Sequence, residues 1–198
     1  MVGSTACVLE SRGTKHAGAK LTYDAFLLFP DDGQRHELIA GEHYVTPSTN
    51  VRHQELLRRL VREFVLYQET HPEGRLFFAP LDCVLTNVDI VEPDLLLVAE
   101  DQLHILADKH VRGAPALVVE ISSAATRRVD EVTKRRLYER VGVREYWIVD
   151  PDANRLAVYR RGGDGAFGVP VMFASREDVL TTPLLPDFRL PLPELFRR

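Results

Sequence analysis

The chain has 198 residues, of which 45% are hydrophobic and 27% are charged. This composition is typical of a globular protein with a sizeable core and excludes a fibrous or wholly disordered chain. The formal net charge of −4 argues against a protein that coats nucleic acid non-specifically, although local patches of charge matter more than the total.

The cysteines and the hydropathy pattern indicate the compartment. Cys7 and Cys83 match no metal-ligand spacing and cannot form a disulfide framework, which favours two reduced thiols. No apolar stretch approaches the roughly 20 residues that cross a bilayer, and the start of the chain lacks a basic flank followed by an apolar core. We therefore predict a cytoplasmic protein without a membrane partner.

The N-terminal part divides into a leader and the start of a domain. Residues 1–20 mix Gly, Ser, Thr and charge without periodicity, so we expect a disordered leader, followed by a single domain over residues 21–198. Thr22 is expected to cap a short helix that extends to Phe29. Residues 36–39 and 43–45 then predict a hairpin around the turn residues Gly41 and Glu42.

The middle of the chain predicts one long helix followed by several strands. Apolar residues recur with helical spacing from about Ser48 to Thr70, while the arginines fall largely elsewhere, which is typical of an amphipathic helix. Strands are predicted at residues 76–78, 82–85, 90–91 and 95–98, and a short helix with a connection at about 100–110.

The C-terminal part predicts a strand at 116–122, a helix from Thr126 to Val141 ended by Gly142, and a strand at 145–149. A hairpin is expected to join residues 156–159 to 169–173. The tail from Leu180 is too rich in proline for a central strand and is expected to wrap the domain. This order of elements predicts an α/β fold of the α+β kind, a mixed sheet with helices against it.

Two acids stand out in this pattern. Glu120 follows a run of apolar strand residues, and Asp94 comes directly before the apolar run Leu95–Val98. A carboxylate at a buried strand end is costly unless positive charge meets it, so the pair suggests a divalent cation or an ion-pair network. If the two strands are neighbours, both acids with water provide the oxygen ligands of Mg²⁺ or Mn²⁺. The alternatives are a turn acid for Asp94 and a structural salt bridge for Glu120.

Further candidates surround this pair. Glu37, in the first hairpin, supplies a third acid, unless it pairs with a base such as Arg35. Asp130, Lys134 and Tyr138 are spaced by four and share one helix face. A lysine near the cation would orient water and offset charge on a phosphate, which suits metal-assisted phosphodiester hydrolysis. The alternative is that Lys134 pairs with Asp130 on a solvated face.

Basic residues and one histidine complete the set. Arg127, Arg128 and Arg135 would contact nucleic-acid phosphates, or would simply keep the helix solvated. His53 precedes the apolar stripe of the long helix, where packing or capping competes with a contact to phosphate or to a metal ligand.

Several of these segments resemble a known family. Pro93–Asp94, the strand that ends in Glu120–Ser122, Lys134 and the segment 142–151 are similar to the Uma family of bacterial restriction endonucleases in the PD-(D/E)XK superfamily. The resemblance runs from about Leu21 to the C-terminus. It implies a restriction-endonuclease-like core with flanking helices and added hairpins, and a Mg²⁺-dependent nuclease site built from Asp94 and Glu120. It also makes a homodimer plausible.

One residue departs from the general pattern of the superfamily. Ser122 stands where a lysine is expected, two residues after Glu120, and the resemblance implies that Lys134 on the following helix takes its place. The sequence thus predicts a Mg²⁺-dependent DNA endonuclease. The alternatives are a module that keeps the nuclease fold but only binds nucleic acid or protein, and a metal-dependent hydrolase of small phosphoesters.

Overall fold

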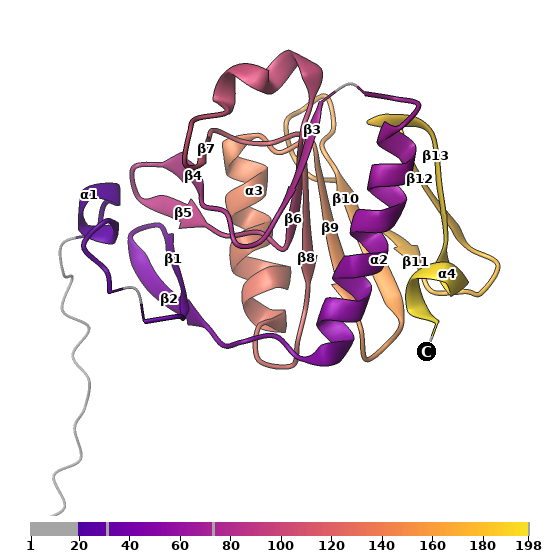
Figure 1. Ribbon diagram of the computed structural model, residues 1–198, viewed down its shortest axis with the longest axis horizontal. Helices are drawn as coiled ribbons and strands as arrows, with labels where there is room; N and C mark the ends of the chain where they lie inside the picture. Colours follow the sequence, from indigo (N-terminus) through magenta and orange to yellow (C-terminus); the bar gives the residue numbers. More distant parts are fainter. Residues whose placement is uncertain (1–19, 31, 73, 198) are drawn as a thin grey trace, which may run out of the picture.

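A six-stranded mixed sheet lies at the centre of the molecule, with helix α2 (Val51–Gln68) on one face and helix α3 (Arg135–Val141) on the other (Figure 1). The computed structural model describes residues 20–30, 32–72 and 74–197, so the predicted leader lies outside the described residues except for Lys20. The strand order is β11-β10-β9-β8-β6-β3. The bounds of these strands are Arg75–Phe78 (β3), Leu95–Val98 (β6), Leu117–Ile121 (β8), Glu145–Asp150 (β9), Arg155–Arg160 (β10) and Val171–Phe173 (β11).

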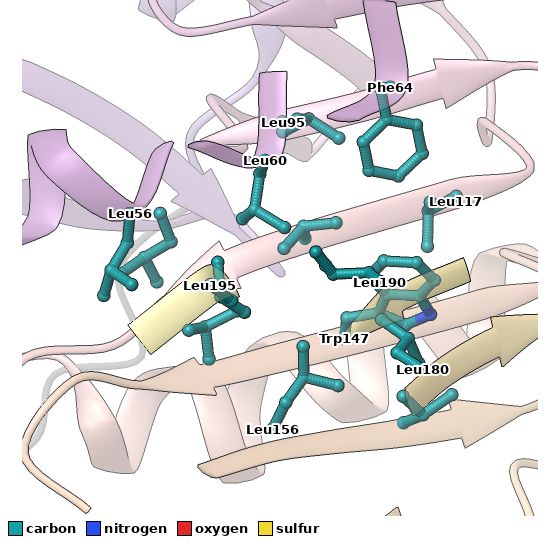
Figure 2. Packing of buried hydrophobic residues seen from close by; sticks show 14 of the residues in the cluster. Leu56, Leu60, Phe64, Leu95, Leu117, Trp147, Leu156, Leu180, Leu190 and Leu195 are labelled. Atoms are coloured by element: carbon teal, nitrogen blue, oxygen red, sulfur yellow. The ribbon is translucent and has the colours of Figure 1, made fainter. Parts of the chain in front are cut away.

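Alternation along the strands divides the core into two layers. Leu117, Val119 and Ile121 of β8 pack in the cluster beneath α2, together with Phe64 and Trp147 (Figure 2). Val118, between them, packs in the opposite cluster with residues of α3. Since successive side chains of a strand point to opposite faces, Glu120 shares the α3 face with Val118. The alternation therefore directs this acid towards α3.

Helix α2 begins where the sequence offers a cap. The Asn50 side chain accepts a hydrogen bond from the main-chain N–H of His53 at 2.9 Å, which satisfies one free donor of the first turn. Its apolar stripe, with Leu56, Leu60 and Phe64 fully buried, covers the sheet. The predicted long helix is confirmed, and it begins three residues later than expected.

The helix after β8 is confirmed in its extent, but its first half is a π-helix over Val129–Lys134 that continues into α3. The wider turn, in which the N–H of Arg135 bonds to the carbonyl of Asp130, was not predicted because periodicity does not separate it from an α-helix. Gly142, with a φ of 97°, ends the helix as expected.

A five-stranded sheet with the order β2-β1-β5-β4-β7 adjoins the central one. Its strands are Arg35–Ile39 (β1), Glu42–Thr46 (β2), Cys83–Thr86 (β4), Asp89–Val91 (β5) and Val111–Arg112 (β7). The predicted hairpin is β1–β2, but its turn residues are Ala40 and Gly41, one position earlier than expected. Both have positive φ, 54° and 78°, as a two-residue hairpin turn requires.

The remaining elements are short. They are α1 (Tyr23–Phe26), shorter than the predicted helix to Phe29, the 3₁₀-helix η1 (Glu100–Ile105), β12 (Val179–Thr182), β13 (Leu185–Pro191) and α4 (Leu192–Phe196). The tail stays outside the central sheet as predicted, but it forms a two-stranded sheet of its own. Its residues Leu180, Phe188 and Leu195 pack in the cluster beneath α2. Within the described ranges, no helix is both long and apolar enough to span a membrane.

Candidate functional site

Asp94 and Glu120 lie on neighbouring strands. β6 and β8 pair antiparallel with Leu95 opposite Val119, and the same register carried one residue further places Asp94 opposite Glu120. Both side chains are buried, with 2% and 3% of their surface exposed. The condition that the sequence left open, neighbouring strands in the right register, is therefore met.

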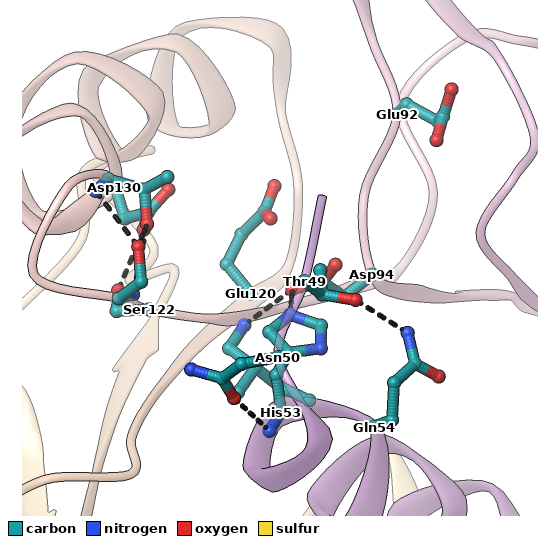
Figure 3. Close-up of polar contacts among 12 residues, drawn as sticks. Thr49, Asn50, His53, Gln54, Glu92, Asp94, Glu120, Ser122 and Asp130 are labelled. Carbon is teal, nitrogen blue, oxygen red and sulfur yellow. Dashed lines mark hydrogen bonds and ion pairs between the residues drawn. The ribbon is translucent and has the colours of Figure 1, made fainter. Parts of the chain in front are cut away.

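Three donors hold the Asp94 carboxylate, among them the His53 ring that lies beside it in Figure 3. Oδ2 accepts from the main-chain N–H of Ile121 at 2.8 Å and lies 3.0 Å from Nε2 of His53, while Oδ1 accepts from Arg35 Nη1 at 3.1 Å. Burial raises the pKa of Asp94, but the hydrogen bond from His53 and the charge of Arg35 outweigh it, so that the pKa lies below its usual value. Asp94 is therefore ionised at neutral pH.

Glu120 meets the predicted helix face. Its Oε1 accepts from Lys134 Nζ at 3.0 Å and from Tyr138 Oη at 2.8 Å. Burial raises the pKa of Glu120, and Lys134 opposes this effect. Burial lowers the pKa of Lys134, but Glu120 and Glu37 raise it far above its usual value, so the amine stays protonated. A permanently charged lysine acts by its charge and not as a base.

Glu37 and Asp130 take different places from those expected. Glu37 Oε1 accepts from Lys134 Nζ at 2.9 Å and from the main-chain N–H of Glu92 at 2.9 Å, so it pairs with the lysine and not with Arg35. Asp130 accepts a hydrogen bond from the hydroxyl of Ser122 at 2.7 Å. The ion pairs of Lys134 with described residues are those to Glu37 and Glu120, so Asp130 is not its partner. The solvated Lys134–Asp130 pair is therefore wrong, because the π-helix buries Lys134 against the acids of the sheet.

Arg35 and Glu92 belong to the site, although the sequence analysis did not select them. Arg35 Nε donates to Glu92 Oε1 at 2.7 Å, so one guanidinium bridges Glu92 and Asp94. Burial raises the pKa of Glu92, against the effect of Arg35. Arg35 lies two residues before Glu37, and Glu92 lies two residues before Asp94. Because residues two apart in a strand point to the same face, this spacing could have identified both residues.

A cavity of about 500 Å³ opens over these groups. Its lining includes Glu37, Asp94, Glu120, Asp130 and Lys134, together with Arg35 and His53. Asp152 and Arg52 line it as well, so five carboxylates meet three side chains of permanent positive charge, and this excess of negative charge favours a bound cation.

The residues fit a divalent cation. Among the described residues, no group of three or more His, Cys, Asp and Glu side chains is arranged as a metal site. Mg²⁺, however, is usually held by one or two carboxylates, with water and substrate phosphate completing its shell. Asp94 and Glu120 supply hard oxygen ligands of this kind and would hold the ion, whereas Glu37 is turned towards Lys134.

The three arginines proposed to contact nucleic acid lie outside this cavity. Arg127 pairs with Asp150 at 3.0 Å, and Arg135 donates to Glu139 at 3.4 Å. Arg128 is exposed. The partners of Arg127 and Arg135 favour the structural alternative for these two residues.

Comparisons with known proteins agree with this fold. The chain is similar to a crystal structure of a putative nuclease belonging to DUF820 from Anabaena variabilis, with a TM-score of 0.75, 19% identity, and coverage of 89% of this chain and 97% of that one. This likeness confirms the predicted α+β fold with a restriction-endonuclease-like core. No curated protein is similar enough to count as a match. The family model Uma2, described as a putative restriction endonuclease, matches residues 23–193. The chain therefore belongs to the Uma2 family.

Proposed function

We propose that this protein is a nuclease that hydrolyses phosphodiester bonds in DNA with the help of Mg²⁺ or Mn²⁺. The carrying observation is the placement of Asp94 opposite Glu120, with Lys134 3.0 Å from the Glu120 carboxylate, at the floor of one cavity. The family and the related nuclease structure support a nuclease-like activity, while the cation and the DNA substrate rest on the chemistry of the site.

The residues of the chain divide the work between them. Asp94 and Glu120 would hold the cation, which supplies Lewis-acid activation of the phosphate and a water molecule of lowered pKa. Lys134, kept protonated by two carboxylates, offsets the negative charge that develops on the phosphate. His53 and the N–H of Ile121 orient Asp94, and Tyr138 orients Glu120.

Other residues keep the lysine and the acids in place. Glu37 shares the Lys134 ammonium with Glu120, and a second hydrogen bond, from the main-chain N–H of Glu92, ties Glu37 to the residue that follows β5. Asp130 fixes Ser122 directly after the strand that carries Glu120. We assign these residues a positioning role, and we further propose that residues 21–198 act as one domain and that two chains pair so that both strands are cut.

A cleavage assay tests the proposal. Supercoiled plasmid, single-stranded DNA and bis-p-nitrophenyl phosphate are incubated with Mg²⁺ or Mn²⁺, and with EDTA as the control. We expect cleavage of DNA that EDTA abolishes and that Glu120→Gln and Asp94→Asn each lower by roughly 100-fold or more. Glu177→Gln, an exposed acid far along the chain, is the matched control and should keep full activity.

The same assay separates the alternatives. Cleavage of the small phosphodiester alone would indicate a phosphoesterase. Cation binding by calorimetry without cleavage of any substrate would indicate a binding module and would contradict the nuclease proposal.

A further inference from the structure

A second cavity of about 650 Å³ lies beside the proposed catalytic site and shares Arg35, His53 and Asp94 with it. One wall is formed by α2, through Gln54, Leu57, Arg58 and Val61, and the other by the segment Phe78–Pro80. None of the roles assigned above uses this space. A substrate that extends from the catalytic cavity past Asp94 would enter it.

Phe78 is an unusual residue in this wall. It is 52% exposed, and among the Phe, Tyr and Trp side chains of the described residues it is the only exposed one. It ends β3, the edge strand of the central sheet. Leu76 packs beneath α2 and Phe77 packs on the other face, so alternation places Phe78 on the α2 side, beyond the part that the helix covers.

The backbone ties Phe78 to the catalytic site. Phe78 lies opposite Leu95 in the β3–β6 ladder, and the N–H of Ala79 donates to the carbonyl of Asp94 at 3.1 Å. The exposed ring therefore belongs to the strand that pairs with β6, one residue away from the position opposite Asp94. This places an apolar, planar surface beside the cavity that would receive the phosphate.

The remaining lining supplies polar and charged groups, among them Glu92, whose carboxylate is paired with Arg35 at 2.7 Å. Gln54 donates to Thr49 Oγ1 at 2.7 Å beside Asp94 (Figure 3), and both residues line the cavity. Arg58, with 58% of its side chain exposed, pairs with Glu55 at 3.1 Å and with no other described residue. Such a surface pair contributes little and leaves the guanidinium available. An apolar plane, amide donors and a cation in one cavity match a nucleobase with its attached phosphate.

Resting on the proposed nuclease function, we infer that this cavity binds an unpaired nucleobase adjacent to the cleaved phosphate, with the base stacked on Phe78 and the neighbouring phosphate against Arg58. A base can reach the ring only when it is out of the duplex stack. The site therefore takes single-stranded or locally opened DNA in preference to intact duplex.

Binding of a short oligothymidylate, followed by fluorescence anisotropy in EDTA, tests this inference without cleavage. Phe78→Ala should weaken binding by roughly 5- to 100-fold, the range for loss of one base–aromatic stack. Phe78→Tyr should bind like the wild type. Met172→Ala, a side chain 47% exposed on the opposite edge strand, is the matched control and should change nothing. Circular dichroism checks that each variant is folded.

A second ligand separates stacking from a structural effect. An abasic oligonucleotide of the same length should bind wild type and Phe78→Ala equally. If the wild type binds oligothymidylate and Phe78→Ala binds it as tightly, or loses both ligands equally, the inference is overturned while the nuclease proposal stands. If the wild type binds no oligonucleotide, the inference is overturned, and the cleavage assay decides separately on the nuclease.

Discussion

The carboxylate of Asp94 accepts a hydrogen bond from the main-chain N–H of Ile121 at 2.8 Å, so it is joined directly to the peptide bond that follows Glu120. Two acids that are 26 residues apart in the sequence are thereby fixed side by side in the central sheet. A main-chain N–H thus supplies one of the hydrogen bonds that the buried Asp94 carboxylate needs. This relationship makes the acidic pair a feature of the fold and not of flexible side chains.

Replacement of Lys134 should destabilise the protein strongly. Lys134→Met removes the cation that pairs with Glu37 and Glu120, both of which stay buried. Loss of one partner of a buried ion pair costs about 3–5 kcal/mol of unfolding free energy. Urea unfolding at pH 7 measures this change. Arg136→Met, on the same helix but exposed, should alter stability by only about 0.5 kcal/mol or less.

A double variant identifies the cause of the Lys134 effect. If the loss comes from unpaired carboxylates, Lys134→Met with Glu120→Gln should recover part of the stability that Lys134→Met loses. Equal stability of the single and double variants would show that packing of the lysine stem, and not its charge, is responsible.

Replacement of Arg35 should strengthen cation binding. Arg35 donates to Asp94 Oδ1 and places a positive charge beside the proposed metal ligand, so it opposes an incoming cation. We expect Arg35→Gln to bind Mn²⁺ about tenfold more tightly in a calorimetric titration. A tenfold change in affinity corresponds to about 1.4 kcal/mol, which is a small part of the repulsion between two neighbouring positive charges. Arg62→Gln, an exposed arginine of α2, serves as the control. Weaker Mn²⁺ binding by Arg35→Gln would mean that Arg35 builds the site instead of competing for it.

The cap of α2 gives a separate prediction on stability. Asn50→Ala removes the acceptor for the N–H of His53, the residue whose ring contacts Asp94. Loss of such a cap costs about 1 kcal/mol, and the midpoint of thermal unfolding should fall accordingly. Asn50→Asp keeps an acceptor and should retain most of the stability. An equal fall for both variants would show that the amide of Asn50, and not its capping oxygen, is needed.

The central acids and the helix face that meets Glu120 were predicted from the sequence, whereas the pairing of Arg35 with Asp94 and Glu92 was not. Asp94 and Glu120 interrupt apolar runs, and a buried charge in such a run is visible without a structure. Their register depends on pairing between strands that 18 residues separate, and local periodicity carries no information on it. Arg35 was missed because its two acidic partners lie far along the chain, in β5's continuation and at the start of β6.

Local departures from regular secondary structure could not be predicted from the spacing of apolar residues either. The spacing of Asp130, Lys134 and Tyr138 predicted one shared face, and all three side chains are buried. The π-helix over Val129–Lys134 was not predicted, because the order of apolar and polar residues in this segment also fits an α-helix. The tail was correctly kept out of the central sheet by its prolines, but those prolines also concealed its own hairpin, β12–β13.

A crystal soaked in Mn²⁺ and measured at the manganese absorption edge tests the central claim most directly. The account predicts an anomalous peak within bonding distance, about 2.1–2.3 Å, of carboxylate oxygens from both Asp94 and Glu120. Oδ1 of Asp94 should then be released from Arg35. A fully occupied Mn²⁺ site elsewhere, with Asp94 still bound to Arg35 and Glu120 still bound only to Lys134 and Tyr138, would contradict it.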